Sequence, residues 1–194
     1  HRRHQGVGRD GGEVTAAGGE ITPLRDHFRK FALYNRWANE AIFAVAAGLS
    51  PAQLEEDRGA FFKSVCGTLN HLLVTDGLWL DRLDGRSPEG IRLDDVLHAS
   101  LPSLRAARSD VDKRFIDRVY DYSEADFAVP LHFRTTAGGE VTLLLAEILA
   151  HVSNHQTHHR GQAHDLICQM LGRDAVPVLD FAIYLRTAGI GDAP

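Results

Sequence analysis

The feature of this 194-residue chain that most restricts its fold is a row of histidines at helical spacing. His151, His155 and His159 stand four residues apart in the segment LLLAEILAHVSNHQTHHRGQ, and His158 lies among them. A helix turns about 100° per residue, so residues four apart lie roughly 40° apart around the axis and about 6 Å apart along it. Two such imidazoles can reach one metal ion. The segment therefore predicts a long helix with metal ligands along one side.

The apolar residues of this helix indicate which histidines face a core. With His155 placed at 0° on a helical wheel, an apolar stripe lies at roughly 20–80°. Its members are Val141, Leu145, Ile148, Val152, Ala163, Leu166 and Met170. His155 lies at the edge of the stripe and His159 within it at about 40°, whereas His151 and His158 lie off it at about −40° and −60°. Burying an imidazole without a partner costs on the order of 1–3 kcal/mol. The pair is therefore either two core histidines bonded to neighbours or two ligands of one metal ion, and its stacking favours the metal.

A third ligand has to come from elsewhere in the chain. Catalytic zinc-like centres generally have three protein ligands and an open position for water or substrate. The best candidate is His71, which lies deep in the apolar run GTLNHLLVTDGLWLDRL. That run is apolar almost all round, so its periodicity does not orient His71, and His151 is the next candidate. Solvated or packing roles are expected for the other histidines, namely His27, His98, His132 and His164, with His1 and His4 in an N-terminal tail.

Composition argues for a single enzyme-sized domain and against several function classes. The 21 basic and 26 acidic side chains form no basic stripe, which argues against nucleic acid as a partner. Cys66 and Cys168 are the only cysteines, so neither a disulfide framework nor a thiolate zinc site is indicated. No apolar run approaches the roughly 20 residues of a membrane span, and no signal-peptide pattern is present. We expect a soluble, cytoplasmic protein that binds no membrane.

The chain divides into a flexible N-terminal lead, residues 1–22, and a metal-binding domain, residues 23–190. The lead is rich in Gly, Arg and Glu and nearly lacks large apolar residues. Helical periodicity and end signals predict four helices in the domain, at about 23–47, 64–83, 101–122 and 142–171, and a closing helical stretch at 179–186. The third helix is expected to present a solvated charged face, formed by Arg105, Arg108, Asp110, Asp112, Lys113 and Arg114.

A short hairpin is predicted before the histidine helix. Residues 127–135 alternate like a strand, Ala137, Gly138 and Gly139 form a turn, and residues 140–142 can pair back. Thr142 is the expected N-cap of the histidine helix.

These motifs together resemble the DinB family of damage-inducible proteins, also described as DinB/YfiT-like metalloenzymes. The residues that carry the resemblance are LNHLL and, about eighty residues later, HVSNHQTHHRGQ, preceded by YNRWANEAI in the first helix. The resemblance covers nearly all of residues 23–190. It implies an all-α, antiparallel four-helix bundle in which one histidine of the second helix and two of a later helix hold a divalent metal. Carried over, the ligands are His71, His155 and His159.

The resemblance also implies a class of activity. Characterised branches of the family are transferases or isomerases that use a low-molecular-weight thiol such as bacillithiol, mycothiol or glutathione. The first hypothesis is thus a metal-dependent thiol S-transferase acting on a small molecule in detoxification or stress response. A metal-dependent hydrolase and a metal-binding protein without turnover remain alternatives. Zinc or nickel is the expected metal; iron, cobalt or copper also suits three imidazoles, and manganese is a further alternative. Family members often form homodimers, and a homodimer is expected here.

Several neighbours of the predicted ligands can act in the site or merely pack. Gln162, at about −20° on the wheel, can hydrogen-bond a ligand imidazole or a bound water. His158 and His151 are either proton carriers or exposed side chains. Gly161 is expected to permit close helix packing. Packing roles are also expected for Asn35, Trp37, Asn39 and Cys66, and Arg160 is expected to point away from the ligands.

Overall fold

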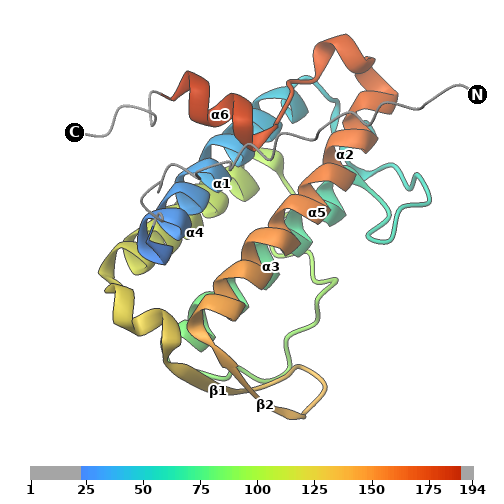
Figure 1. The fold of residues 1–194 in the computed structure, drawn as a ribbon. Coiled ribbons are helices and arrows are strands. Elements are labelled where there is room, and N and C mark those ends of the chain that lie inside the picture. Colours follow the sequence, from blue (N-terminus) through green and yellow to red (C-terminus); the bar gives the residue numbers. More distant parts are fainter. Residues whose placement is uncertain (1–22, 189–194) are drawn as a thin grey trace, which may run out of the picture.

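The computed structural model describes residues 23–188, and the four long helices of this part form an antiparallel bundle (Figure 1). They are α1 (Leu24–Ala46), α3 (Val65–Leu83), α4 (Leu101–Asp121) and α5 (Leu145–Leu171). In Figure 1 the orange α5 runs alongside the green α3, and α1 packs against both α4 and α5. The mostly helical fold expected from the sequence is confirmed. The expected N-terminal lead, residues 1–22, lies outside the described residues.

Shorter elements complete the described part of the chain. The five-residue α2 (Pro51–Glu55) follows α1, and α6 (Phe181–Thr187) packs on α1, where Tyr34, Ala38 and Tyr184 form a small cluster. Two 3₁₀ turns, η1 (Glu124–Ala128) and η2 (Arg173–Ala175), follow α4 and α5. None of the helices within residues 23–188 is long and apolar enough to cross a membrane.

Polar side chains define where the site-bearing helices begin. Ser64 caps α3 by accepting a hydrogen bond from the Gly67 amide at 3.0 Å. At the start of α5, the Glu147 carboxylate accepts from the Leu144 amide at 2.8 Å. The N-cap of α5 is therefore Leu144, and the expectation that Thr142 caps this helix is wrong. Thr142 lies in a strand instead, because the hairpin extends two residues further than its sequence pattern indicated.

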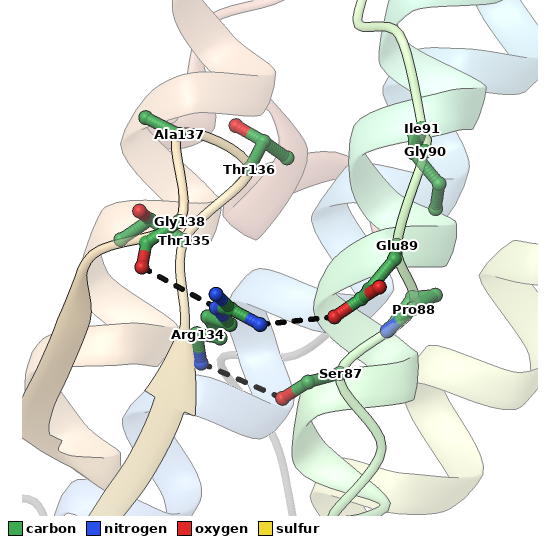
Figure 2. Close-up of a pocket in the computed structure, with 10 residues that line it drawn as sticks. All are labelled: Ser87, Pro88, Glu89, Gly90, Ile91, Arg134, Thr135, Thr136, Ala137 and Gly138. Atoms are coloured by element: carbon green, nitrogen blue, oxygen red, sulfur yellow. Dashed lines mark hydrogen bonds and ion pairs between the residues drawn. The ribbon is translucent and has the colours of Figure 1, made fainter.

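The predicted hairpin is present at one end of the bundle, with strands β1 (Pro130–Arg134) and β2 (Glu140–Leu144). They pair antiparallel with His132 opposite Thr142. The strand begins at Pro130 rather than Phe127, because Phe127 belongs to η1 and its ring stacks on Phe28 of α1. The hairpin is also tied to the connector that follows α3. Figure 2 shows Arg134 reaching across to this connector, where its guanidinium pairs with Glu89 at 3.0 Å and its backbone amide donates to the Ser87 hydroxyl oxygen at 3.5 Å.

The charged face of α4 differs from the expectation at two positions. Arg108 and Asp112 are each 3% exposed, whereas Arg105, Asp110, Lys113 and Arg114 are exposed. The reason is their spacing: Leu104, Phe115 and Val119 are buried on α4, and residues 108 and 112 continue that inner face at helical period. The expectation of one solvated face is therefore wrong for these two side chains.

Arg108 and Asp112 take part in a buried polar network between the helices. Arg108 donates to Asp76 of α3 at 2.7 Å and lies 2.9 Å from the Asp112 carboxylate. Gln156 of α5 donates to the same Asp76 at 3.0 Å. Buried ions are tolerated when they are paired and hydrogen-bonded. This part of the network joins α3, α4 and α5.

A second buried arginine extends the network to α1. Arg160 of α5 donates to the side-chain oxygens of Asn35 and Asn39 on α1. Both asparagines in turn donate to Asp112, at 3.1 and 3.0 Å. Arg160 thus points away from the predicted metal ligands, as expected, while Asn35 and Asn39 make polar bonds in addition to packing. The two arginines and two aspartates of the network balance in charge.

Candidate metal centre

The fold brings His71, His155 and His159 together between α3 and α5. His71 is 3% exposed, and the two α5 histidines are half-buried. One ligand atom from each of the three imidazoles lies within 4.8 Å of the others. Nε2 of His71 is 3.3 Å from Nε2 of His155. Two nitrogens that bind one tetrahedral metal ion at about 2.0–2.1 Å lie about 3.4 Å apart, so the observed spacing fits a shared ion.

Hydrogen bonds to the outer ring nitrogens orient two of the imidazoles. Nδ1 of His71 donates to the Leu93 carbonyl oxygen at 2.8 Å, and Nδ1 of His159 donates to Oε1 of Gln162 at 2.7 Å. Because a carbonyl oxygen only accepts, these contacts place the proton on Nδ1 and leave Nε2 with a free lone pair. That is the tautomer a metal requires. Nδ1 of His155 is buried and has no partner among the described residues.

The electrostatics keep the imidazoles neutral. Burial lowers the pKa of His71 from 6.5 to about 4, against the opposing effect of the hydrogen bond to Leu93. Burial, followed by the neighbouring His159 and His71, lowers the pKa of His155 to about 3. Burial also lowers the pKa of His159. Neutral imidazoles are the form that binds a metal ion, so at neutral pH the three side chains require no deprotonation.

Phe62 covers one side of the cluster and was not found by sequence reasoning. Its ring stacks on His71 with centroids 3.7 Å apart and meets His159 edge-on at 5.4 Å. The loop that carries it approaches α3 closely, because a Cβ on Gly67 would lie 2.1 Å from the Phe62 carbonyl oxygen. The next residue, Lys63, has a φ of 66°, a conformation that side-chain-bearing residues rarely adopt. The one available signal in the sequence was Gly67 in FFKSVCG, since a glycine permits another backbone segment to approach. A glycine alone does not show that the approaching residue is Phe62.

Asn70, next to His71, forms hydrogen bonds with the connector between α3 and α4. Its side chain donates to the His98 carbonyl at 3.0 Å and accepts from the His98 amide at 3.0 Å, and it is fully buried. Two adjacent α3 residues therefore hold this connector, Asn70 through His98 and His71 through Leu93. Sequence reasoning missed Asn70, because its partners are backbone groups of an irregular segment.

The other predicted neighbours lie around the cluster in different ways. His158 is exposed and accepts a contact from Gln162 at 3.4 Å, and His151 is exposed with its ring against Trp79 at 5.1 Å. Cys66 is buried and bonded to Asn70, and burial raises the pKa of its thiol. Gly161 is exposed, and a Cβ there would meet nothing within 4 Å, so the expectation that it permits close packing is wrong.

The histidines that were not expected to be ligands lie apart from the cluster. His132 bonds Thr142 at 2.9 Å in the hairpin, and Nε2 of His164 donates to the Pro177 carbonyl at 2.9 Å. His27 packs on Phe31 of its own helix, while His98 contacts Asn70 through its backbone. None of the four joins the three-histidine group found within residues 23–188.

Fold and cluster together define a class of protein: a helical bundle with a three-histidine group between two of its helices. A model of the DinB family matches residues 23–191, and the chain belongs to that family. The expectation drawn from LNHLL and HVSNHQTHHRGQ is thereby confirmed.

Individual relatives agree with this assignment. The protein named Protein DinB from Bacillus subtilis (strain 168) is 25% identical over 166 residues, which cover 84% of this chain and 95% of that protein. The crystal structure of a DinB-like protein from Bacillus cereus ATCC 10987 matches with a TM-score of 0.55 and 16% identity, covering 72% of this chain and 90% of that one. At this identity the second comparison concerns the fold alone.

Proposed function

We propose that this chain is a divalent-metal-dependent enzyme of the thiol S-transferase type, with His71, His155 and His159 as the metal ligands. The observation that supports this proposal most directly is the number and type of the possible metal ligands. The three imidazoles form a group within 4.8 Å, and no carboxylate or cysteine of residues 23–188 joins it. Structural zinc sites are closed by a fourth protein ligand, whereas catalytic sites keep that position open. Three donors therefore favour turnover over a purely structural metal.

The residues around the cluster fit this chemistry. A bound divalent ion would supply a Lewis acid that favours the deprotonated form of a thiol at neutral pH. The Leu93 carbonyl and Gln162 orient the ligand rings, and Phe62 shields one side from water. His158 is exposed beside His159, and we propose that it passes the thiol proton to solvent. The sulfur would then form a bond to an electrophilic carbon, whose leaving group departs with the bonding electrons.

The identities of the metal and the thiol rest on chemistry and on family resemblance. Zinc or nickel suits three imidazoles, and we propose a small-molecule electrophile with bacillithiol, mycothiol or glutathione as the thiol. The biological setting that we propose is detoxification or stress response, with the chain acting as a homodimer.

The experiment that tests the proposal starts with untagged protein and elemental analysis. The metal-loaded protein is then incubated with each thiol and 1-chloro-2,4-dinitrobenzene, and the thioether product is measured against the His155→Ala/His159→Ala double variant. Thiol-dependent product that disappears in the double variant supports the proposal. If the protein instead hydrolyses test esters at a rate that added thiol does not change, it is a hydrolase. One bound metal without turnover of either kind would indicate a metal-binding protein.

A further inference from the structure

A hollow of about 380 Å³ lies beside the three-histidine cluster. It is bounded on one side by the loop between α2 and α3 and on the other by the connector before α4. Phe62 lines this hollow, and its ring also contacts His71 and His159. None of the three histidines lines the hollow, and Phe62 is the residue that lies between the hollow and the predicted ligands.

Two strongly exposed apolar side chains line the hollow, among charged and polar neighbours. Phe61 is 84% exposed and Val96 is 59% exposed, and both line it. Leu93 and Leu97, also exposed, flank Val96 on the connector. Exposed apolar groups gathered in a concavity mark binding sites. A cavity of about 150 Å³ already holds benzene, so this hollow has room for a substituted aromatic ring.

The charges around the hollow argue against an anionic occupant. Glu55 and Asp57 line one side and Asp94 the other, with Asp94 paired to Arg92 at 3.1 Å. Among the residues that line the hollow, Lys63 is the one basic side chain. The rim therefore holds no surplus positive charge for a carboxylate, and glutathione-like thiols carry carboxylates. The charges thus disfavour an anion, and the exposed Phe61 and Val96 side chains favour an uncharged apolar group.

The loop that forms the hollow is held in place by backbone features. Lys63 has a φ of 66°, and Gly67 allows the Phe62 carbonyl to approach α3. Residues in such sparsely populated conformations persist where the surroundings hold them, and they gather at ligand sites. The wall carrying Phe61 and Phe62 is thus preformed.

From these observations we propose that the hollow binds the uncharged aromatic or aliphatic body of the electrophilic substrate, while the thiol binds at the cluster itself. The proposal rests on the thiol-transferase function for the second substrate, but binding in the hollow does not itself require a metal. Phe62 then lies between the two binding positions, since it lines the hollow and contacts His71 and His159.

The test uses 4-fluorobenzyl alcohol, an uncharged aromatic probe, observed by ¹⁹F NMR. For a ligand of this size we expect a Kd on the order of 1 mM. With Co²⁺ loaded in place of Zn²⁺, the bound probe should relax faster, because stacked rings place it on the order of 10 Å from the metal. Val96→Asp should weaken binding at least tenfold with unchanged metal content.

Val178→Asp is the matched control, since Val178 is also 59% exposed but lies on the segment before α6. It should leave probe binding and relaxation unchanged. Equal binding in the wild type and Val96→Asp, or no binding in the wild type, would overturn the proposal. In the His155→Ala/His159→Ala variant the probe should still bind, without the Co²⁺ effect. That result distinguishes loss of probe binding in the hollow from loss of metal binding at the histidines.

Discussion

Nε2 of His71 and Nε2 of His155 lie 3.3 Å apart across the interface between α3 and α5. Their partners on the outer side of the rings differ. His71 is oriented by the Leu93 carbonyl, whereas Nδ1 of His155 has no described partner. A metal ion between the inner nitrogens would satisfy both lone pairs at once.

The wild-type protein should bind about one divalent ion per chain, and His155→Ala or His159→Ala should abolish binding. Elemental analysis and metal titration measure this. His164→Ala is the control, because His164 bonds the Pro177 carbonyl and lies outside the group. At a free metal concentration of 100 Kd, the ion should add roughly 2.7 kcal/mol to the free energy of unfolding. Equal metal content in all three variants would refute the ligand assignment.

His71→Ala tests the third ligand separately from the α5 pair. The variant should lose metal affinity, because two imidazoles alone leave the ion weakly held. His151→Ala should retain wild-type affinity, since His151 is exposed and packs against Trp79. Unchanged affinity in His71→Ala together with a loss in His151→Ala would move the third ligand to His151.

Asn70→Ala should lower metal affinity about 10- to 100-fold, the effect expected when a group that supports a ligand is removed. The physical reason is that Asn70 holds His98 by two hydrogen bonds and so steadies the connector that carries Leu93. The Co²⁺ absorption spectrum should shift as the His71 ring loses its orientation. Tyr34→Phe removes the hydrogen bond to the Leu179 carbonyl and should cost about 1 kcal/mol of stability with unaltered metal affinity. A matching loss of affinity in both variants would make the Asn70 effect a general one.

Arg108→Met should lower the free energy of unfolding by about 3–5 kcal/mol, because it leaves Asp76 and Asp112 buried without their cation. Denaturant titration measures the change. Arg105→Met, at an exposed position of the same helix, should change stability by less than about 0.5 kcal/mol. Similar small effects in both would mean that the buried network contributes little.

The metal-free protein should lose stability as the pH falls below about 6.5. In the unfolded chain an imidazole takes up a proton near pH 6.5, whereas folded His71 and His155 do so only near pKa values of about 4 and about 3. Between those values the unfolded state binds more protons, so stability rises with pH and is fully present above about 6.5. Denaturant titrations in chelator from pH 4 to 7.5 measure the slope. A His155→Phe variant should show a shallower slope, and an identical slope would contradict the assignment.

Much of the fold was predictable because it depends on local signals. The spacing of apolar residues and the end signals place the bounds of α1, α3 and α4 within one residue of those observed, whereas α5 begins at Leu145, three residues after its expected start. Two residues four apart on one helix necessarily lie on one side of it, so the relation between His155 and His159 needed no tertiary information.

Other parts of the site depend on contacts between distant segments. The direction of His71 was undetermined, because α3 is apolar almost all round and any of its faces can be buried. Phe62, which stacks on His71, and His98, whose backbone is hydrogen-bonded by Asn70, both lie in irregular loops. Periodicity makes no prediction for such loops. Arg108 and Asp112 carry the charges of surface residues, although their spacing follows the inner face of α4.

The sequence by itself determined the helices, the hairpin before α5, the family and the pair His155 and His159, since each follows from residues close together in the chain or from a motif. Only the tertiary structure decided that His71 meets that pair within 4.8 Å, that Phe62 covers the cluster beside an apolar hollow, and that buried charges join the helices. The physical reason is that these relations depend on the packing of α3 against α5 and on loop backbone geometry, which local spacing does not encode.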